Sequence, residues 1–317
     1  TDMAVLNADD PHCLKMADHA RSRRIGYVTM NHDHPLVREH IRLKGFAVVL
    51  EQGINGHMIS LYDHGQQFPL LWTHLIPATL EGRALHNVQN ALFAAGLAYA
   101  MAVDLDNIRQ GLRTFDASFF QTPGRMNVYD EHPFRVILDY AHNPAAVQNI
   151  CQVVDRFQVA GRKILVLGAP GDRRDEDIAE VARLTASHFD HFILKADDNP
   201  RGRAPEEVPE LLRRTLLDAG VAGEAMEIVL PETGANERAL CMARAGDLIL
   251  TLAENVTRTW KQIIYFKPEA GVMAERRDRQ EAIDLSSLGF GEVRLEGLEI
   301  IRDERGVRLV REPGSER

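Results

Sequence analysis

The sequence of 317 residues lacks the features that would assign it to several common classes of protein. It contains no signal peptide and no apolar run of membrane-spanning length, so we expect a protein of the cytoplasm. It also has no excess of basic residues, because its formal net charge is −9. Affinity for nucleic acids and membrane surfaces depends on clustered Lys and Arg, so neither is an expected partner and a small molecule is.

Cysteine is scarce as well. Cys13, Cys151 and Cys241 are scattered, and they form neither a metal-binding pair nor an even-numbered disulfide framework. Each lies in or near an apolar helical pattern, so we expect buried thiols in a reducing environment. No metal site is predicted from these residues.

The motif G-x-x-x-x-G-K-[ST], whose backbone and Lys hold the β and γ phosphates of a nucleotide, does not occur in the chain. A nucleotide site built from these residues would therefore rest on contacts with the base, the ribose and a single phosphate. It would lack the loop that positions the transferred group.

The residues that are present predict an α/β fold. Hydrophobic residues make up 45% and charged residues 26%, which at this length allows two globular domains. After a polar link, strands alternate with helices, which predicts a doubly wound, mainly parallel sheet. The apolar strands are expected at 136–138, 164–167, 192–194, 227–230 and 248–252.

The residues before this sheet follow a different pattern. Short strands are expected at 4–6 and 25–30, and 46–72 has the alternation of antiparallel hairpins. A buried helix is predicted at 86–102 and an amphipathic one at 106–115. We place a domain boundary near residue 118 and, after a charged stretch at 275–281, expect a hairpin of 298–302 and 307–310 about the turn at 304–306. Because the chain opens on a buried-type strand, we also expect a preceding segment.

The stretch 120–144 combines several groups suited to nucleotide chemistry. Arg125 follows a Pro-Gly turn, where its planar fork can reach a phosphate, and Asp139 ends an apolar strand, where it can accept from ribose hydroxyls. His142 and Asn143 then stand at the start of a helix whose first residue is Pro144. A helix N-terminus favours anions. Alternatively, Arg125 is solvated or ion-paired, and His142 and Asn143 do no more than cap the helix.

Asn87 and Asn90 stand at the start of the helix predicted at 86–102. They are three residues apart and therefore share one face. A carboxamide donates and accepts at once, as the edge of an adenine requires. The alternative is that Asn87 caps the helix and Asn90 satisfies a neighbouring backbone group.

Two further loops carry charges after predicted strands. In 168–177, glycines allow the backbone to bend closely around a ligand, and Arg173 and Arg174 add positive charge. In 195–203, Asp198, Asn199 and Arg201 could hold the ammonium and carboxylate of an amino acid between them. The alternatives are a charged, solvated helix start for the first loop and an ordinary turn for the second.

Five motifs carry a resemblance to a known family: AVLNADDP (4–11), IPATLEGRALHNVQNALFAAGLAYA (76–100), FFQTPGRMNVYDEHPFRVILDYAHNPAAV (119–147), APGDRRDEDI (169–178) and RTWKQIIYF (258–266). In this order they resemble the Mur ligase family of ATP-dependent amino-acid ligases and, within it, the branch that synthesises cyanophycin. The resemblance implies that 1–117 is the latter half of a central ATP-binding domain, that 118–270 is a Rossmann-like C-terminal ligase domain, and that 271–317 is a tail.

The resemblance also implies roles for single residues. Asn87 and Asn90 would contact adenine, Arg125 a phosphate and Asp139 the ribose, with His142 and Asn143 nearby. Arg125 and His142 are the catalytic candidates. A D-N-P-R segment holds the incoming amino acid in relatives that add a diamino acid, and 198–201 is similar to it, which supports an acceptor site there together with Arg173 and Arg174.

The function implied by the resemblance is the ATP- and Mg²⁺-dependent joining of Arg to the side-chain carboxylate of Asp in a poly-Asp chain through an acyl phosphate. Expected partners are ATP, Arg, the polymer, upstream P-loop and ATP-grasp modules, and further copies of the chain. This chain is not expected to be active alone, because the family's P-loop, magnesium-binding acidic residue and modified lysine lie upstream of its first residue. Two alternatives stay open: a non-catalytic nucleotide- or amino-acid-binding domain, and another cell-wall or folate-type ligase.

Overall fold

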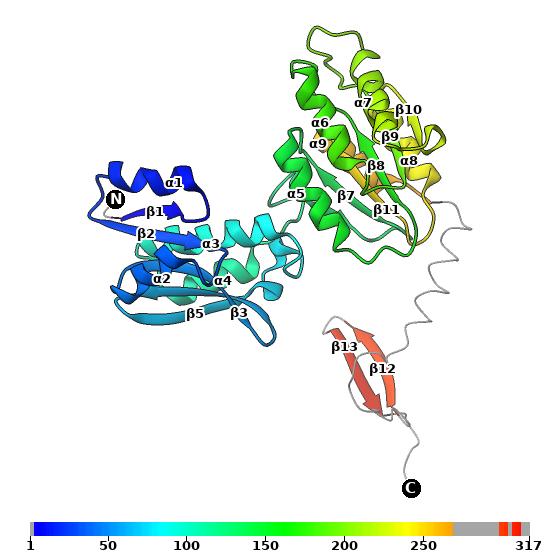
Figure 1. The fold of residues 1–317 in the computed structure, drawn as a ribbon. Helices are drawn as coiled ribbons and strands as arrows, with labels where there is room; N and C mark the ends of the chain where they lie inside the picture. The colour runs from blue at the N-terminus through cyan, green and yellow to red at the C-terminus, as the bar shows by residue number, and fades with distance from the viewer. Residues whose placement is uncertain (1–2, 269–297, 304–305, 312–317) are drawn as a thin grey trace. The chain divides into compact units, whose positions relative to one another are not determined.

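A computed structural model describes residues 3–268, 298–303 and 306–311 (Figure 1). The chain divides into two compact units, 1–273 and 274–317. In the second unit, β12 (Leu298–Asp303) pairs antiparallel with β13 (Gly306–Arg311), at the positions of the two predicted strands. The predicted charged stretch at 275–281 and residues 304 and 305 of the predicted turn lie outside the described residues.

The first unit contains two sheets, and the first of these has five strands. Its strands, in spatial as well as chain order, are β1 (Met3–Asn7), β2 (Arg24–Thr29), β3 (Phe46–Gly53), β4 (Gly56–Asp63) and β5 (Gln66–Trp72). β1, β2 and β3 are parallel, whereas β3, β4 and β5 form the antiparallel hairpins predicted for 46–72.

Helices cover both faces of the first sheet. They are α1 (Pro11–Lys15), α2 (Pro35–Arg42), α3 (Leu85–Ala100) and α4 (Leu105–Thr114), with short 3₁₀ turns η1 (Met16–His19), η2 (Thr73–Leu75) and η3 (Pro77–Thr79). Val88 and Leu92 of α3 share a core with Val48 of β3, while Val37 of α2 packs on the other face. The prediction of a buried helix holds for one face of α3, because Val88 and Leu92 are buried whereas Leu97 is 50% exposed.

The second sheet has six strands in the order β10-β9-β8-β11-β7-β6. Their bounds are β6 (Asn127–Tyr129), β7 (Arg135–Asp139), β8 (Lys163–Leu167), β9 (His191–Leu194), β10 (Met226–Ile228) and β11 (Leu248–Leu252). All pairs are parallel except β6 with β7, so the doubly wound, mainly parallel sheet is confirmed. β6 lies where the sequence predicted only a polar link, because three residues are too few to show a strand pattern.

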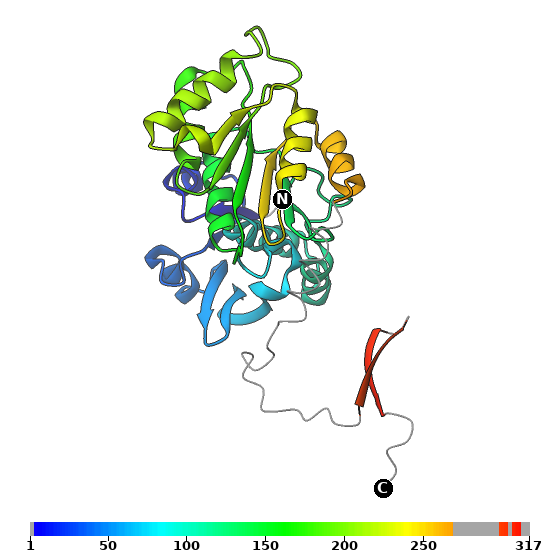
Figure 2. The ribbon, with the colours of Figure 1, turned by 90° about the vertical axis from the view of Figure 1, so that its right-hand side faces the viewer.

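The second sheet lies between two layers of helices (Figure 2). The helices are α5 (Pro144–Asp155), α6 (Asp175–Thr185), α7 (Glu207–Asp218), α8 (Glu232–Met242) and α9 (Val256–Tyr265), with a 3₁₀ turn η4 (Gly223–Ala225). Successive strand residues face opposite layers: Ile137 packs with α5, α6 and α7, and Val136 and Leu138 pack with α8 and α9. Burial on both faces explains why these strands are continuous apolar runs.

The cysteines differ in exposure. Cys151 is buried as predicted, Cys13 is half-buried, and Cys241 is exposed, so the prediction of three buried thiols is wrong for Cys241. Among the residues that the structure describes, none of the helices has the length and apolar character needed to cross a membrane.

Candidate functional site

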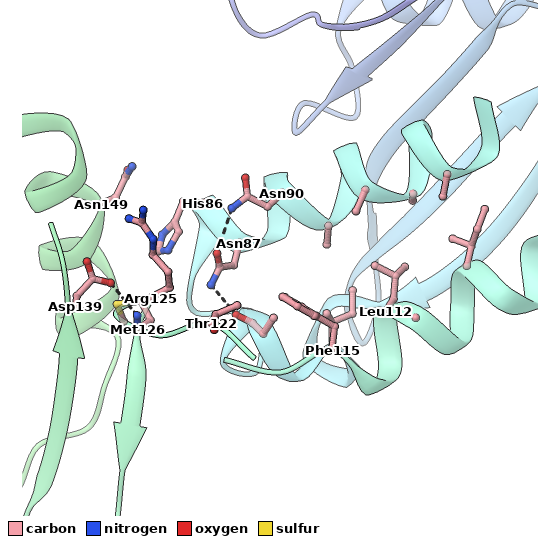
Figure 3. A pocket seen from close by; sticks show the side chains of 18 of the residues that line it. His86, Asn87, Asn90, Leu112, Phe115, Thr122, Arg125, Met126, Asp139 and Asn149 are labelled. Carbon is pink, nitrogen blue, oxygen red and sulfur yellow. Dashed lines mark hydrogen bonds between the residues drawn. The ribbon is translucent and has the colours of Figure 1, made fainter. Parts of the chain in front are cut away.

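Of three cavities lined by described residues of the first unit, the largest has a volume of about 680 Å³, within the range of small-molecule sites. One part of it is apolar and lies between α3 and α4, and the other part carries the polar side chains (Figure 3). The polar lining residues are His86, Asn87, Asn90, Asn107, Thr122, Arg125, Asp139 and Asn149. The cavity therefore brings together the four residues that the sequence analysis assigned to adenine, ribose and phosphate.

The two carboxamides of α3 are linked to each other. The Asn90 amide donates to the Asn87 side-chain oxygen at 3.3 Å, and the Asn87 amide donates to the carbonyl of Ala78 at 2.7 Å. Asn87 is not the helix cap, because Ala84 occupies the N-cap position. The capping alternative for Asn87 is therefore wrong, although its amide does satisfy a backbone carbonyl. His86 also lines the cavity, and burial lowers its pKa.

The turn that carries Arg125 is fixed from inside the fold. Asp139 is 5% exposed, and its two oxygens accept from the N–H groups of Met126 at 2.8 Å and Ala141 at 2.7 Å. Burial raises the pKa of Asp139, while these N–H groups and the Arg125 guanidinium oppose the shift. Arg125 itself is exposed at the cavity and has no ion pair within the described part of the chain. The exposure of Arg125 agrees with the solvated alternative, and the described residues contain no partner for the ion-paired one.

The side chain of Asn127 stabilises this turn, and the sequence patterns did not predict this role. Its side chain is fully buried; the oxygen accepts from the N–H of Gly124 at 2.7 Å, and the amide donates to the carbonyls of Ala117 and Thr122. A buried carboxamide with all these partners orders the backbone on both sides of Arg125. The sequence offered one weak indication of this role, a polar residue at the start of a strand of three residues.

His142 and Asn143, which were expected near Asp139 and the ribose, do not line the largest cavity. They line a second cavity of about 300 Å³, together with Arg173 and Asp177. Asn143 is the N-cap of α5, since its oxygen accepts from the N–H of Ala146 at 3.0 Å. The predicted N-cap position of Asn143 is thus confirmed, whereas the ring of His142 contacts the carbonyl of Tyr140 at 3.0 Å.

The glycines of 168–177 make room for a neighbouring loop. A Cβ on Gly171 would lie 2.2 Å from the carbonyl oxygen of Pro200, and one on Gly168 would lie 2.9 Å from the Lys195 ammonium nitrogen. These glycines were expected to let the backbone bend around a ligand, but in the structure they allow two loops to pack closely. Arg174 is exposed and pairs with Asp177 at 2.9 Å, as the solvated alternative predicts.

The loop 195–203 is held by ion pairs. Arg201 is paired with Asp172 at 3.0 Å, and Asp198 is paired with Arg258 of α9. The Asn199 oxygen accepts from the N–H of Arg201 at 3.0 Å, which is the ordinary turn contact. Arg201 lines a third, small cavity of about 20 Å³, whereas Asp198 and Asn199 do not.

The third cavity introduces charged residues that the sequence analysis did not single out. It is lined by Tyr140, Ala141, His142, Gly168, Ala169, Pro170, Lys195, Asp197, Arg201, Leu252, Ala253 and Glu254. His142 and Ala169 also line the second cavity, so the two cavities adjoin. Burial and the neighbouring Asp197 carboxylate raise the pKa of Glu254, although the N–H of Asp198 opposes the shift.

The lining residues decide which class of ligand each cavity fits. The largest cavity supplies carboxamides, a guanidinium and a carboxylate beside an apolar wall, which fits an adenine nucleotide. The second and third cavities supply charges of both signs, which fits an amino acid. Within the described ranges, no group of three or more His, Cys, Asp or Glu side chains could hold a metal ion, so no residue is assigned to Mg²⁺.

Comparisons with known proteins find similar sequences. Residues 124–255 match the family described as Mur ligase, glutamate ligase domain. The cyanophycin synthetase of Synechocystis sp. is 37% identical over 265 residues, which cover 84% of this chain and 29% of that protein. The cyanophycin synthetase of Nostoc sp. is 40% identical over 265 residues, which cover 82% of this chain and 28% of that protein.

A solved structure has a fold similar to that of this chain. The structure described as E. coli FolC in complex with DHPP and ADP matches with a TM-score of 0.52 at 20% identity, covering 83% of this chain and 61% of that one. The chain spans less than a third of the length of the two synthetases. Residues 124–255 therefore belong to the Mur ligase family, and the chain is similar over most of its length to part of the two cyanophycin synthetases.

Proposed function

We propose that this chain carries the adenine-nucleotide site and the amino-acid site of an ATP-dependent ligase that joins Arg to the side-chain carboxylate of Asp in a poly-Asp chain. One observation carries the proposal: Asn87, Asn90, Arg125 and Asp139 are far apart in the sequence and line one cavity. The similarity to proteins named cyanophycin synthetase supports the choice of amino acid and polymer. The domain boundary near residue 118 is part of the same proposal.

In the nucleotide site, the carboxamides of Asn87 and Asn90 would bond the edge of the base. Each oxygen of Asp139 accepts one backbone N–H and keeps a second lone pair, so it can also accept from a ribose hydroxyl. Arg125, exposed and without an ion pair in the described residues, would bind a phosphate. The apolar wall between α3 and α4 offers contact to the faces of the base.

In the amino-acid site, Arg173 and Arg201 would bind the carboxylate, and Asp197 and Glu254 would bind the guanidinium. The third cavity is too small for a whole Arg, so the amino acid would occupy the second cavity and reach the charges at its edge. His142 lines both cavities, which puts it beside the reacting amine in this arrangement.

The reaction would proceed in two transfers. The γ-phosphoryl group of ATP passes to a carboxylate oxygen of the polymer, and the α-amine of Arg then attacks the carbonyl carbon of this acyl phosphate. Phosphate leaves, the amine loses a proton, and an isopeptide bond, ADP and phosphate result. Residues of this chain would act by positioning the reactants and neutralising phosphate charge.

The test uses the full-length protein, ATP, a poly-Asp primer and labelled amino acids. Replacing Arg125 or Asp139 by Ala should abolish Arg incorporation while addition of Asp to the backbone continues. Gln148→Ala, an exposed change on α5, is the control and should leave both activities unaltered. Unchanged Arg incorporation in both site variants would refute the proposal.

A competition assay decides between related ligases. A diamino acid that displaces Arg would indicate a cell-wall type of activity, and a folate-type acceptor would indicate the other branch of the superfamily. Calorimetry with ATP and ADP distinguishes the ligase from the non-catalytic binding domain. Tight binding of ATP without hydrolysis by the full-length protein would support the non-catalytic alternative.

A further inference from the structure

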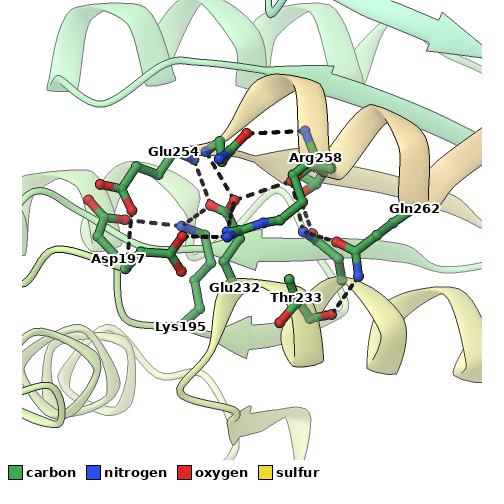
Figure 4. A network of polar contacts seen from close by, with 12 residues as sticks. Lys195, Asp197, Glu232, Thr233, Glu254, Arg258 and Gln262 are labelled. Atoms are coloured by element: carbon green, nitrogen blue, oxygen red, sulfur yellow. Dashed lines mark hydrogen bonds and ion pairs between the residues drawn. The ribbon is translucent and has the colours of Figure 1, made fainter.

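A buried lysine lies at the centre of a network of charges in the second sheet (Figure 4). Lys195 follows β9 and is 1% exposed. Its ammonium nitrogen lies 3.1 Å from an oxygen of Asp197 and 3.0 Å from an oxygen of Glu232. A buried ammonium is tolerated only with such partners, so these contacts decide where the start of the 195–203 loop lies.

Glu232 is the second centre of the network. It begins α8, is fully buried, and accepts from the N–H groups of Glu254 at 2.6 Å and Asn255 at 3.0 Å. It also accepts from the Thr259 hydroxyl at 3.2 Å. Burial alone would raise the pKa of Glu232, but Lys195 and these N–H groups lower it to about 2. Glu232 is therefore an anion at neutral pH and holds the turn that follows β11.

Glu232 begins α8, after β10, and through the N–H groups of Glu254 and Asn255 it links Lys195 to the turn after β11. The loops after β9 and β11 are thus connected although β8 lies between these two strands. The crossing is possible because residue 168, directly after β8, is Gly and leaves space for the Lys195 side chain. The two loops also meet directly, since the N–H of Asp198 donates to Glu254 at 2.6 Å. The 195–203 loop and the 253–258 turn are thus fixed relative to each other by one buried pair.

We propose that the Lys195–Glu232 pair is a positioning device that sets the affinity for the amino-acid substrate without contacting it. This inference rests on the proposed function, in which the amino acid occupies the second cavity and reaches the charges of the adjoining third cavity, which residues of both loops line. An apolar pair of similar volume would stabilise the fold about as well, but it could not hold the N–H groups of the turn after β11. The ionic pair is therefore suited to fixing loop geometry in particular.

The first test is Lys195→Met in the full-length protein. The apparent KM for Arg should rise about tenfold or more, while the KM for ATP stays within about twofold. Lys195→Arg keeps the charge and should restore part of the affinity. The matched control is Lys163→Met, which removes a 3.1 Å pair with Asp155 at the opposite end of the sheet and should leave the KM for Arg unchanged.

A more conservative substitution tests the same proposal if Lys195→Met does not fold. Thr259→Val keeps the shape of a buried side chain and removes one of the hydrogen bonds to Glu232. The KM for Arg should rise about two- to threefold, again without a matching change for ATP. An unchanged KM for Arg in a folded variant, or equal losses for Arg and ATP, would overturn the positioning role.

Amide hydrogen exchange separates failure of this inference from failure of the proposed function. In Thr259→Val and in folded Lys195→Met, amides of 196–203 and 254–258 should exchange about tenfold faster than in the wild type, while strand amides keep their rates. If the wild-type protein does not incorporate Arg, the proposed function is wrong and the exchange rates still decide the positioning. Wild-type rates of amide exchange in both loops of these variants would exclude a positioning role for the Lys195–Glu232 pair.

Discussion

The largest cavity and the Lys195–Glu232 network satisfy their polar groups in opposite ways. At the cavity, Arg125 is exposed without an ion pair in the described residues. In the network, Lys195 and Glu232 are buried, and each contacts two or more partners of this chain. Groups left open toward a cavity are available to a ligand, whereas groups that satisfy one another maintain the backbone around it. The cavity residues are thus the ones proposed to bind a ligand, and the network residues are the ones proposed to position the backbone.

The largest effect on stability is expected from Glu232→Ala, which tests the network side of the comparison. The change leaves Lys195 buried with Asp197 as its remaining partner, and the free energy of unfolding should fall by about 3–5 kcal/mol. Urea denaturation measures it. Glu180→Ala, which removes an exposed pair with Arg183, is the control and should cause no measurable loss. A loss no larger than that of the control would show that Glu232 is not essential to the network.

Acid should weaken the network in a defined pH range. The pKa of Glu232 is lowered from 4.5 to about 2 in the folded protein, so between these values the unfolded chain binds the proton more readily. Its contribution, about 3 kcal/mol, is complete above pH 4.5 and is lost as the pH falls toward 2. Urea denaturation from pH 6 to 2 should show this slope in the wild type and a smaller one in Glu232→Gln. Equal slopes would contradict the assignment.

A smaller effect is expected at the cavity, where Asp139→Ala should weaken ADP binding by roughly 1.5–3 kcal/mol, the strength of a hydrogen bond to a charged group. Calorimetry measures it. Part of any loss would come from Met126, whose N–H loses its acceptor. Asp139→Asn keeps the shape and one acceptor oxygen, so it should lose less. Full ADP affinity in both variants would show that Asp139 belongs with the positioning residues and not with the binding residues.

The smallest effect is expected from Arg201→Ala, which lies at the edge of the network. Arg201 pairs with Asp172 at 3.0 Å on the surface, and a substrate carboxylate would have to compete for it. The apparent KM for the amino acid should rise by no more than about tenfold, with kcat little changed. Steady-state kinetics with the full-length protein measures both constants. A KM equal to that of the wild type would remove Arg201 from the acceptor site.

The sequence predicted the strands of the second sheet well, for a physical reason. Parallel strands covered on both faces are continuous apolar runs, so 136–138, 164–167 and 248–252 stand out from their surroundings. The position of Asp139 at a strand end was also visible, and such ends meet at one edge of the sheet.

The Lys195–Glu232 pair could not be predicted in the same way. In the sequence, Lys195 is one lysine after a strand, and Glu232 is one glutamate after a proline. Their contact depends on the pairing of β9 with β10, which brings the residue after β9 close to the start of α8 and which local spacing does not determine. Likewise, the separation of His142 from the largest cavity depends on how α5 leaves the end of β7, and no pattern of residue types encodes it.

The glycines after β8 have a consequence for how the substrate preference of such an enzyme can change. Because Gly168 and Gly171 leave room for Lys195 and for the carbonyl of Pro200, neither can acquire a side chain while the opposing loop keeps its shape. A new amino-acid preference introduced in 195–203 must therefore keep the backbone path of that loop or be accompanied by changes in 168–171. Engineered variants with a different acceptor should accordingly be sought by mutating both loops in one library.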